Sequence, residues 1–76
     1  MERKWLKDLR KEKGLTLKEL GQRVGHSESY LFHLENGTRK GKGLTVELIC
    51  RIAEATGALA YDLLQEEQEW LKEARG

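Results

Sequence analysis

The chain has 76 residues, including 14 Lys and Arg, 13 Asp and Glu, one Cys and no Pro. This length suits one domain with a modest core and is too short for a deep catalytic cavity. The lone cysteine cannot form an internal disulfide, and the segment after Met1 is charged, so we expect a cytoplasmic protein without a secretory or membrane-spanning segment.

Charge is distributed unevenly along the chain. Residues 1–43 carry 11 Lys and Arg against 6 Asp and Glu, a net of +5, while residues 44–76 carry 3 against 7, a net of −4. The N-terminal half could therefore face a polyanion while the other half faces away. Two ordinary solvated surfaces would give the same asymmetry.

The abundance of Leu, Glu and Lys predicts an all-α chain. Two helices are predicted in its first third. The first covers about residues 2–12, and Gly14 fits its end. Its apolar stripe has helical spacing: Trp5, Leu6 and Leu9. The second begins at Thr16, which forms a capping-box pattern with Glu19, and ends at Gly25.

A third helix follows after a turn of only about three residues. Ser27 is a good N-cap and Gly37 a good terminator, which predicts a helix over Ser27–Glu35. Two helices joined by so short a turn must cross steeply, in helix-turn-helix geometry. The second of them can then enter a DNA major groove about 12 Å wide.

Two more helices are expected after a basic, glycine-rich loop at residues 38–43. One is capped by Thr45 and runs to about Thr56, and the other covers about residues 60–74. The expected core face of the fourth helix comprises Leu48, Ile49, Ile52 and Ala53. We also expect Cys50 to be a small buried core residue.

Five segments match one family in a single register: 9–20, 24–31, 34–37, 52–57 and 62–64. Over roughly residues 4–64 the chain resembles the lambda-repressor-like, Cro/C1-type (XRE) helix-turn-helix family. The resemblance implies a compact five-helix DNA-binding domain over residues 1–64, with residues 65–76 as a C-terminal helical extension. It also implies binding to double-stranded operator DNA, usually as a dimer.

The resemblance further implies roles for individual side chains. The positions that correspond to base-reading or groove-facing residues are Glu28, Ser29, Phe32 and His33. The phosphate-contacting candidates, which include the basic residues around them, are Thr16, Leu17, Lys18, Arg23, Ser27, Tyr30, Asn36, Arg39, Lys40 and Lys42. Family members often have glutamine at the position of Leu17, so backbone amides would hold a phosphate there. Arg10 and Glu35 would form a structural ion pair.

Several of these side chains have two interpretations from the sequence alone. Glu28 could accept a hydrogen bond from cytosine N4, although a stabilising role in the first helical turn is favoured. Phe32 could contact a thymine methyl group or cover the edge of the core. Ser29 and His33 could bond to bases or be solvated. The two histidines and the cysteine lack zinc-ligand spacing, so we expect no metal or cofactor.

The last predicted helix extends its apolar stripe beyond the family pattern. The stripe comprises Leu63, Leu64, Glu67, Trp70, Leu71 and Ala74. It could pack against Trp5 in the same chain or against a second copy. We favour a dimer, with Leu63, Trp70 and Leu71 as interface candidates, because a symmetric DNA reader benefits from two linked half-sites.

The sequence therefore predicts a homodimeric transcriptional repressor that binds a near-palindromic operator, without a membrane or an evident small-molecule ligand as partner. A protein-interaction module with the same fold and weak DNA binding is the alternative, because the third helix presents Glu28 and no Arg or Lys. An enzyme is not expected, since no nucleophile–base or paired-acid arrangement is present.

Overall fold

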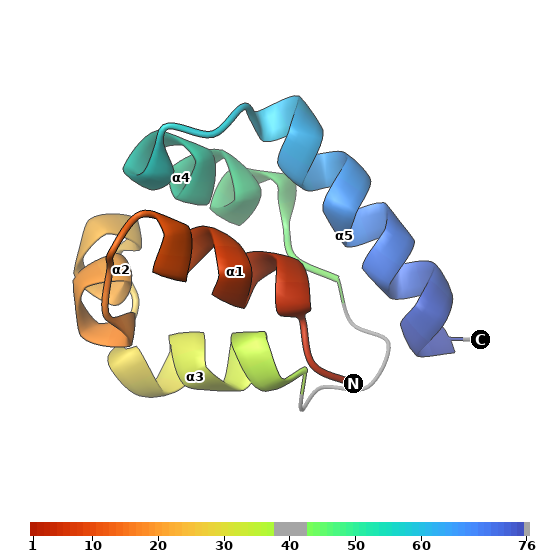
Figure 1. Ribbon diagram of the computed structural model, residues 1–76, viewed down its shortest axis with the longest axis horizontal. Helices are drawn as coiled ribbons and strands as arrows, with labels where there is room; N and C mark the ends of the chain where they lie inside the picture. Colours follow the sequence, from red (N-terminus) through yellow and green to blue (C-terminus); the bar gives the residue numbers. More distant parts are fainter. Residues whose placement is uncertain (38–42, 76) are drawn as a thin grey trace.

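The computed structural model describes residues 1–37 and 43–75, and these contain five helices and no strand. The helices are α1 (Lys4–Glu12), α2 (Leu17–Val24), α3 (Glu28–Asn36), α4 (Val46–Thr56) and α5 (Ala60–Arg75). Figure 1 shows α1 in the middle, with α3 and α4 on either side of it and α2 and α5 at opposite ends. The predicted all-α fold is confirmed.

The helix ends follow local signals in the sequence. Thr16 and Glu19 form the capping box of α2: Thr16 Oγ1 accepts a hydrogen bond from the Glu19 amide, and the Glu19 carboxylate accepts one from the Thr16 amide. Ser27 and Thr45 cap α3 and α4 in the same way, each accepting from an amide three residues later. α2 ends at Gly25, whose φ of 78° lies in the left-handed region.

The first helix begins two residues later than predicted. Arg3 has φ −87° and ψ 77°, which is not helical, and its amide donates to the carbonyl of Glu35 at 2.6 Å. This long-range bond directs the first three residues along the end of α3 instead of continuing α1 backward.

The core lies between all five helices. Its buried aliphatic side chains are Leu6, Leu15, Leu20, Val24, Leu31, Leu48, Ile49, Ile52, Ala53 and Leu63. Fully burying one large aliphatic side chain contributes about 1.5–3 kcal/mol. Gly21 lets the turn after α2 pass close to this helix, since a Cβ there would lie 2.6 Å from the His26 carbonyl oxygen.

The expectation that Cys50 is buried is wrong, because its side chain is exposed. The core face of α4 is formed by Leu48, Ile49, Ile52 and Ala53, as predicted. Cys50 lies four residues after the exposed Val46 and therefore shares its outward face.

The structure also corrects the preferred interpretation of the C-terminal stripe. Leu63 and Trp70 are only 4% and 5% exposed within a single chain, so neither side chain belongs to an open apolar face. Trp70 Nε1 donates to the Glu2 carbonyl at 2.9 Å, and Trp5 Nε1 donates to Glu67 Oε1 at 3.2 Å. The alternative, in which the stripe folds back near Trp5, describes this arrangement.

Candidate nucleic-acid interface

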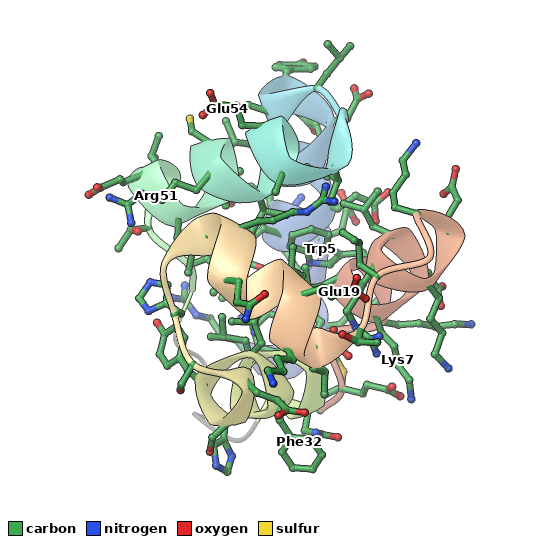
Figure 2. The ribbon with its side chains drawn as sticks, turned by 90° about the vertical axis from the view of Figure 1, so that its left-hand side faces the viewer. Trp5, Lys7, Glu19, Phe32, Arg51 and Glu54 are labelled. Carbon is green, nitrogen blue, oxygen red and sulfur yellow. The ribbon has the colours of Figure 1, made fainter. Side chains whose placement is uncertain are left out.

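One face of α3 is open to solvent and carries all four predicted base-reading side chains. Helix α3 buries Leu31 and Glu35. Its exposed side chains are Glu28, Ser29, Phe32, His33 and Asn36. Helical periodicity places these residues on adjoining rows of one surface. Figure 2 shows Phe32 at the lower edge of the molecule, pointing away from its body.

Phe32 displays its ring instead of covering the core. The side chain is 51% exposed, and its ring meets that of His33 edge-on, with 5.6 Å between the centroids. Of its two interpretations, contact with an external apolar group fits this position better. Ser29 and His33 add hydrogen-bonding groups beside the ring.

The first turn of α3 is held by contacts around the helix-turn-helix turn. His26 stacks on Tyr30 with 4.4 Å between ring centroids, and Tyr30 is half-buried against the core. Ser27 Oγ accepts from the Tyr30 amide at 3.1 Å. These contacts orient the start of α3, while the phosphate-contacting roles of Ser27 and Tyr30 stay predictions.

The start of α2 is the segment predicted to hold a phosphate through its backbone amides. Leu17 is partly buried against the core, so its side chain does not point to an external phosphate. Hydrogen bonds from the backbone and side chain of Thr16 lower the pKa of Glu19, which therefore stays ionised at the helix start. This carboxylate accepts from the Thr16 amide and Lys18 is exposed, while the phosphate contact at this helix start stays a prediction.

Arg23 is directed to a different side of the molecule from α3. Its Nη1 donates to the Ala55 carbonyl at 3.0 Å, near the C-terminal end of α4. Helices α3 and α4 lie on opposite sides of α2 (Figures 1 and 2), so this contact directs Arg23 toward α4 and away from the exposed face of α3. Arg23 is exposed and has further N–H donors, so its phosphate contact stays a prediction.

A second arginine, which the sequence analysis missed, braces the turn itself. Arg51 Nη1 donates to the Val24 carbonyl at 3.3 Å, and Nη2 donates to Glu47 Oε1 at 2.8 Å. Arg51 thus links α4 to the last turn of α2 (Figure 2). The available signal was that Arg51 is one of only three Lys and Arg residues in the acidic segment 44–76.

The remaining phosphate candidates lie at or beyond the end of α3. Asn36 is exposed, and its Nδ2 donates to the Phe32 carbonyl at 2.7 Å, so the amide turns back onto its own helix. Arg39, Lys40 and Lys42 lie outside the described residues.

Arg10 and Glu35 lie against each other, as the resemblance implies. Their two hydrogen bonds measure 2.5 Å from Nε to Oε2 and 3.1 Å from Nη2 to Oε1. Arg10 Nη1 also donates to the Leu15 carbonyl at 2.8 Å. Glu35 is 4% exposed, so this bidentate pair joins α1 to α3 inside the protein.

A second buried ion pair, Arg3 with Glu67, was not found from the sequence. Arg3 Nε donates to Glu67 Oε1 at 2.9 Å, and both side chains are almost fully buried. The available signal was one acidic residue, Glu67, within the apolar stripe of the last helix. Its partner lies 64 residues away, which no local pattern shows.

The comparison with protein families agrees with this architecture. The model described as helix-turn-helix matches residues 6–64, and the chain belongs to this Cro/C1-type family. It is thus a DNA-binding helix-turn-helix domain of the regulator type. No curated protein and no solved structure matched the chain. Helix α5 continues past the matched residues to Arg75.

Among the described helices, none has the length and apolarity to cross a membrane.

Proposed function

We propose that the protein is a sequence-specific transcriptional repressor that binds a near-palindromic operator as a homodimer. The solvent-exposed face of α3 carries the proposal, because it presents Ser29, Phe32 and His33 together beyond the steep turn from α2. A helix presented in this way can lie in the major groove, where base pairs differ in their donors, acceptors and methyl groups.

The exposed side chains of α3 can contact bases, whereas the phosphate contacts must come from residues around this helix. Ser29 and His33 can hydrogen-bond base edges, and Phe32 can pack on a thymine methyl group. Glu28 can accept from cytosine N4 or stabilise the first turn of α3. Because the face has no Lys or Arg, affinity must come from phosphate contacts around it, with Lys18 as one donor. We assign further phosphate contacts to the basic residues Arg39, Lys40 and Lys42.

A homodimer follows from the reading of a two-fold symmetric operator. Each α3 would occupy one major groove, and the two half-sites would lie about 34 Å apart. Leu63 and Trp70 are committed to contacts within the chain, so they do not form the dimer contact. Leu71 is half-buried, and its exposed part could contact a second copy of the chain.

DNA binding is tested by titrating the protein against random duplexes and against duplexes from the region upstream of its own coding sequence, at several salt concentrations. We expect log K to fall linearly with log salt, by about 0.9 for each phosphate contact. We also expect some upstream duplexes to bind more tightly than random ones. Absence of binding even at low salt would overturn the proposal.

The role of Phe32 has its own control. Phe32→Ala should weaken operator binding about fourfold, on the basis of about 0.8 kcal/mol for one buried methyl group. Replacing thymine by uracil in the operator should remove this difference. Tyr61→Ala, which truncates an exposed aromatic side chain on α5, should bind like the wild type. An equal effect of both substitutions would argue against base reading by Phe32.

One observation favours a second function, a protein-interaction module with weak DNA binding. The described face of α3 combines the carboxylate of Glu28 with the half-exposed ring of Phe32 and contains no Lys or Arg. Such a face could also receive a protein. A flat salt dependence in the DNA titration would support this function instead.

A further inference from the structure

The C-terminal end of α3 accepts polar contacts from the N-terminal segment of the chain. Helix termini leave carbonyl groups without partners inside the helix, and a cation near them is favourable. Here one residue outside α3 satisfies two of these groups. The Arg3 amide donates to the Glu35 carbonyl at 2.6 Å, and Arg3 Nη1 donates to the Leu34 carbonyl at 2.5 Å.

Arg3 is in turn held by the C-terminal half of α5. Its Nε and Nη2 donate to the two carboxylate oxygens of Glu67 at 2.9 and 3.1 Å. Its Cζ lies 3.9 Å from the centroid of the Trp70 ring, and Trp70 Nε1 donates to the neighbouring Glu2 carbonyl. Arg3 is 2% exposed, so the guanidinium is enclosed between α3 and α5.

Glu67 connects further parts of the chain to this contact. Besides the two bonds from Arg3, its carboxylate accepts from Trp5 Nε1 at 3.2 Å and from the Leu44 amide at 2.8 Å. The carboxylate is therefore bonded to α1, to the segment before α4 and to the N-terminal segment. Because a buried ion pair contributes little net stability compared with apolar packing, its effect here is better described as fixing an arrangement.

We propose that Arg3, Glu67 and Trp70 are positioning residues for α3, the helix that the proposed function places in the major groove. The turn after α2 holds the N-terminal end of α3, and these three residues hold the opposite end through the Leu34 and Glu35 carbonyls. The angle of α3 in the groove then depends on residues of α5 that lie outside the segment matched by the family model. The part of this proposal that concerns base reading rests on the proposed function.

The test compares two variants with the same change of charge on the same helix. Glu67→Gln removes the buried carboxylate, whereas Glu69→Gln removes an exposed one that lies 3.9 Å from Lys72. Both are titrated with operator and random duplexes under conditions where circular dichroism shows them to be folded. For Glu67→Gln we expect operator affinity to fall about tenfold, with unchanged affinity for random DNA and an unchanged salt slope.

Amide hydrogen exchange supplies a readout that does not depend on DNA. Exchange in the last turn of α3 should be faster in Glu67→Gln than in Glu69→Gln or the wild type. If Glu67→Gln does not fold, Trp70→Phe, which keeps a ring but loses the bond to Glu2, should show the same two changes. An unchanged operator-to-random ratio in the folded variant would overturn the proposal.

The exchange measurement also separates this proposal from the proposed function. If the wild type binds no DNA, the function fails, and faster exchange in α3 would still support the positioning contact. Unchanged exchange in both Glu67→Gln and Trp70→Phe would overturn the contact itself.

Discussion

Two helix-terminating glycines allow a matched test of how firmly the N-terminal segment is held. Gly37 ends α3 with φ 62°, and Gly57 ends α4 with φ 78°. A Cβ at Gly57 would meet nothing within 4 Å. A Cβ at Gly37 would overlap the Met1 carbonyl group and lie 3.0 Å from Trp70 Cζ2. Alanine is therefore strained at both positions, but only at Gly37 must other residues move.

The expected loss of stability follows from these differences. A left-handed alanine costs about 1–2 kcal/mol, which is the full expectation for Gly57→Ala. Gly37→Ala must also displace the N-terminal segment. This puts at risk the bond from Trp70 Nε1 to the Glu2 carbonyl and the bond from the Arg3 amide to α3. At about 0.5–1.5 kcal/mol each, these bonds bring the expected loss for Gly37→Ala to about 2–5 kcal/mol.

Urea unfolding followed by circular dichroism measures both losses as free energies of unfolding. The same pair of substitutions in a Trp70→Phe background gives a control, because the difference between Gly37→Ala and Gly57→Ala should then shrink. Equal losses for the two single variants would refute the reasoning, since they would show that the N-terminal segment moves aside without cost.

Three further outcomes are expected. Because Thr16 lowers the pKa of Glu19, the stabilising effect of the carboxylate is present above the unfolded-chain pKa of about 4.3 and is lost as pH falls through the lower folded value. Glu19→Gln should therefore reduce the dependence of melting temperature on pH in that acidic range; an identical pH dependence would speak against this. Arg10→Met and Glu35→Leu should each lower the free energy of unfolding by about 3 kcal/mol, because each leaves a buried charge without its partner. The double variant should lose clearly less than the sum of the two; additive losses would show that the two residues are not coupled. Cys50→Ser should change stability by less than about 0.5 kcal/mol, and the thiol should react rapidly with a thiol reagent in the folded protein; slow reaction would contradict its exposure.

The exposed face of α3 could be placed from the sequence, but the directions of the side chains around it could not. Helical periodicity relates Phe32 to its neighbours on α3 once the helix bounds are known, and these bounds follow from Ser27 and Gly37. The directions of Leu17 and Arg23 depend instead on what α2 packs against. α2 packs Leu17 toward the core and brings Arg23 to the Ala55 carbonyl.

The sequence by itself determined the five helices, their caps and the short turn between α2 and α3, because each of these depends on residues within about four positions of one another. Only the tertiary structure decided that Cys50 faces outward and that the C-terminal half of α5 folds back onto the N-terminal segment. The bond between Arg3 and Glu67 spans 64 residues, and it forms because packing buries both side chains at the same place. A charged side chain buried in the interior must be paired, but the sequence does not show which distant residue is its partner.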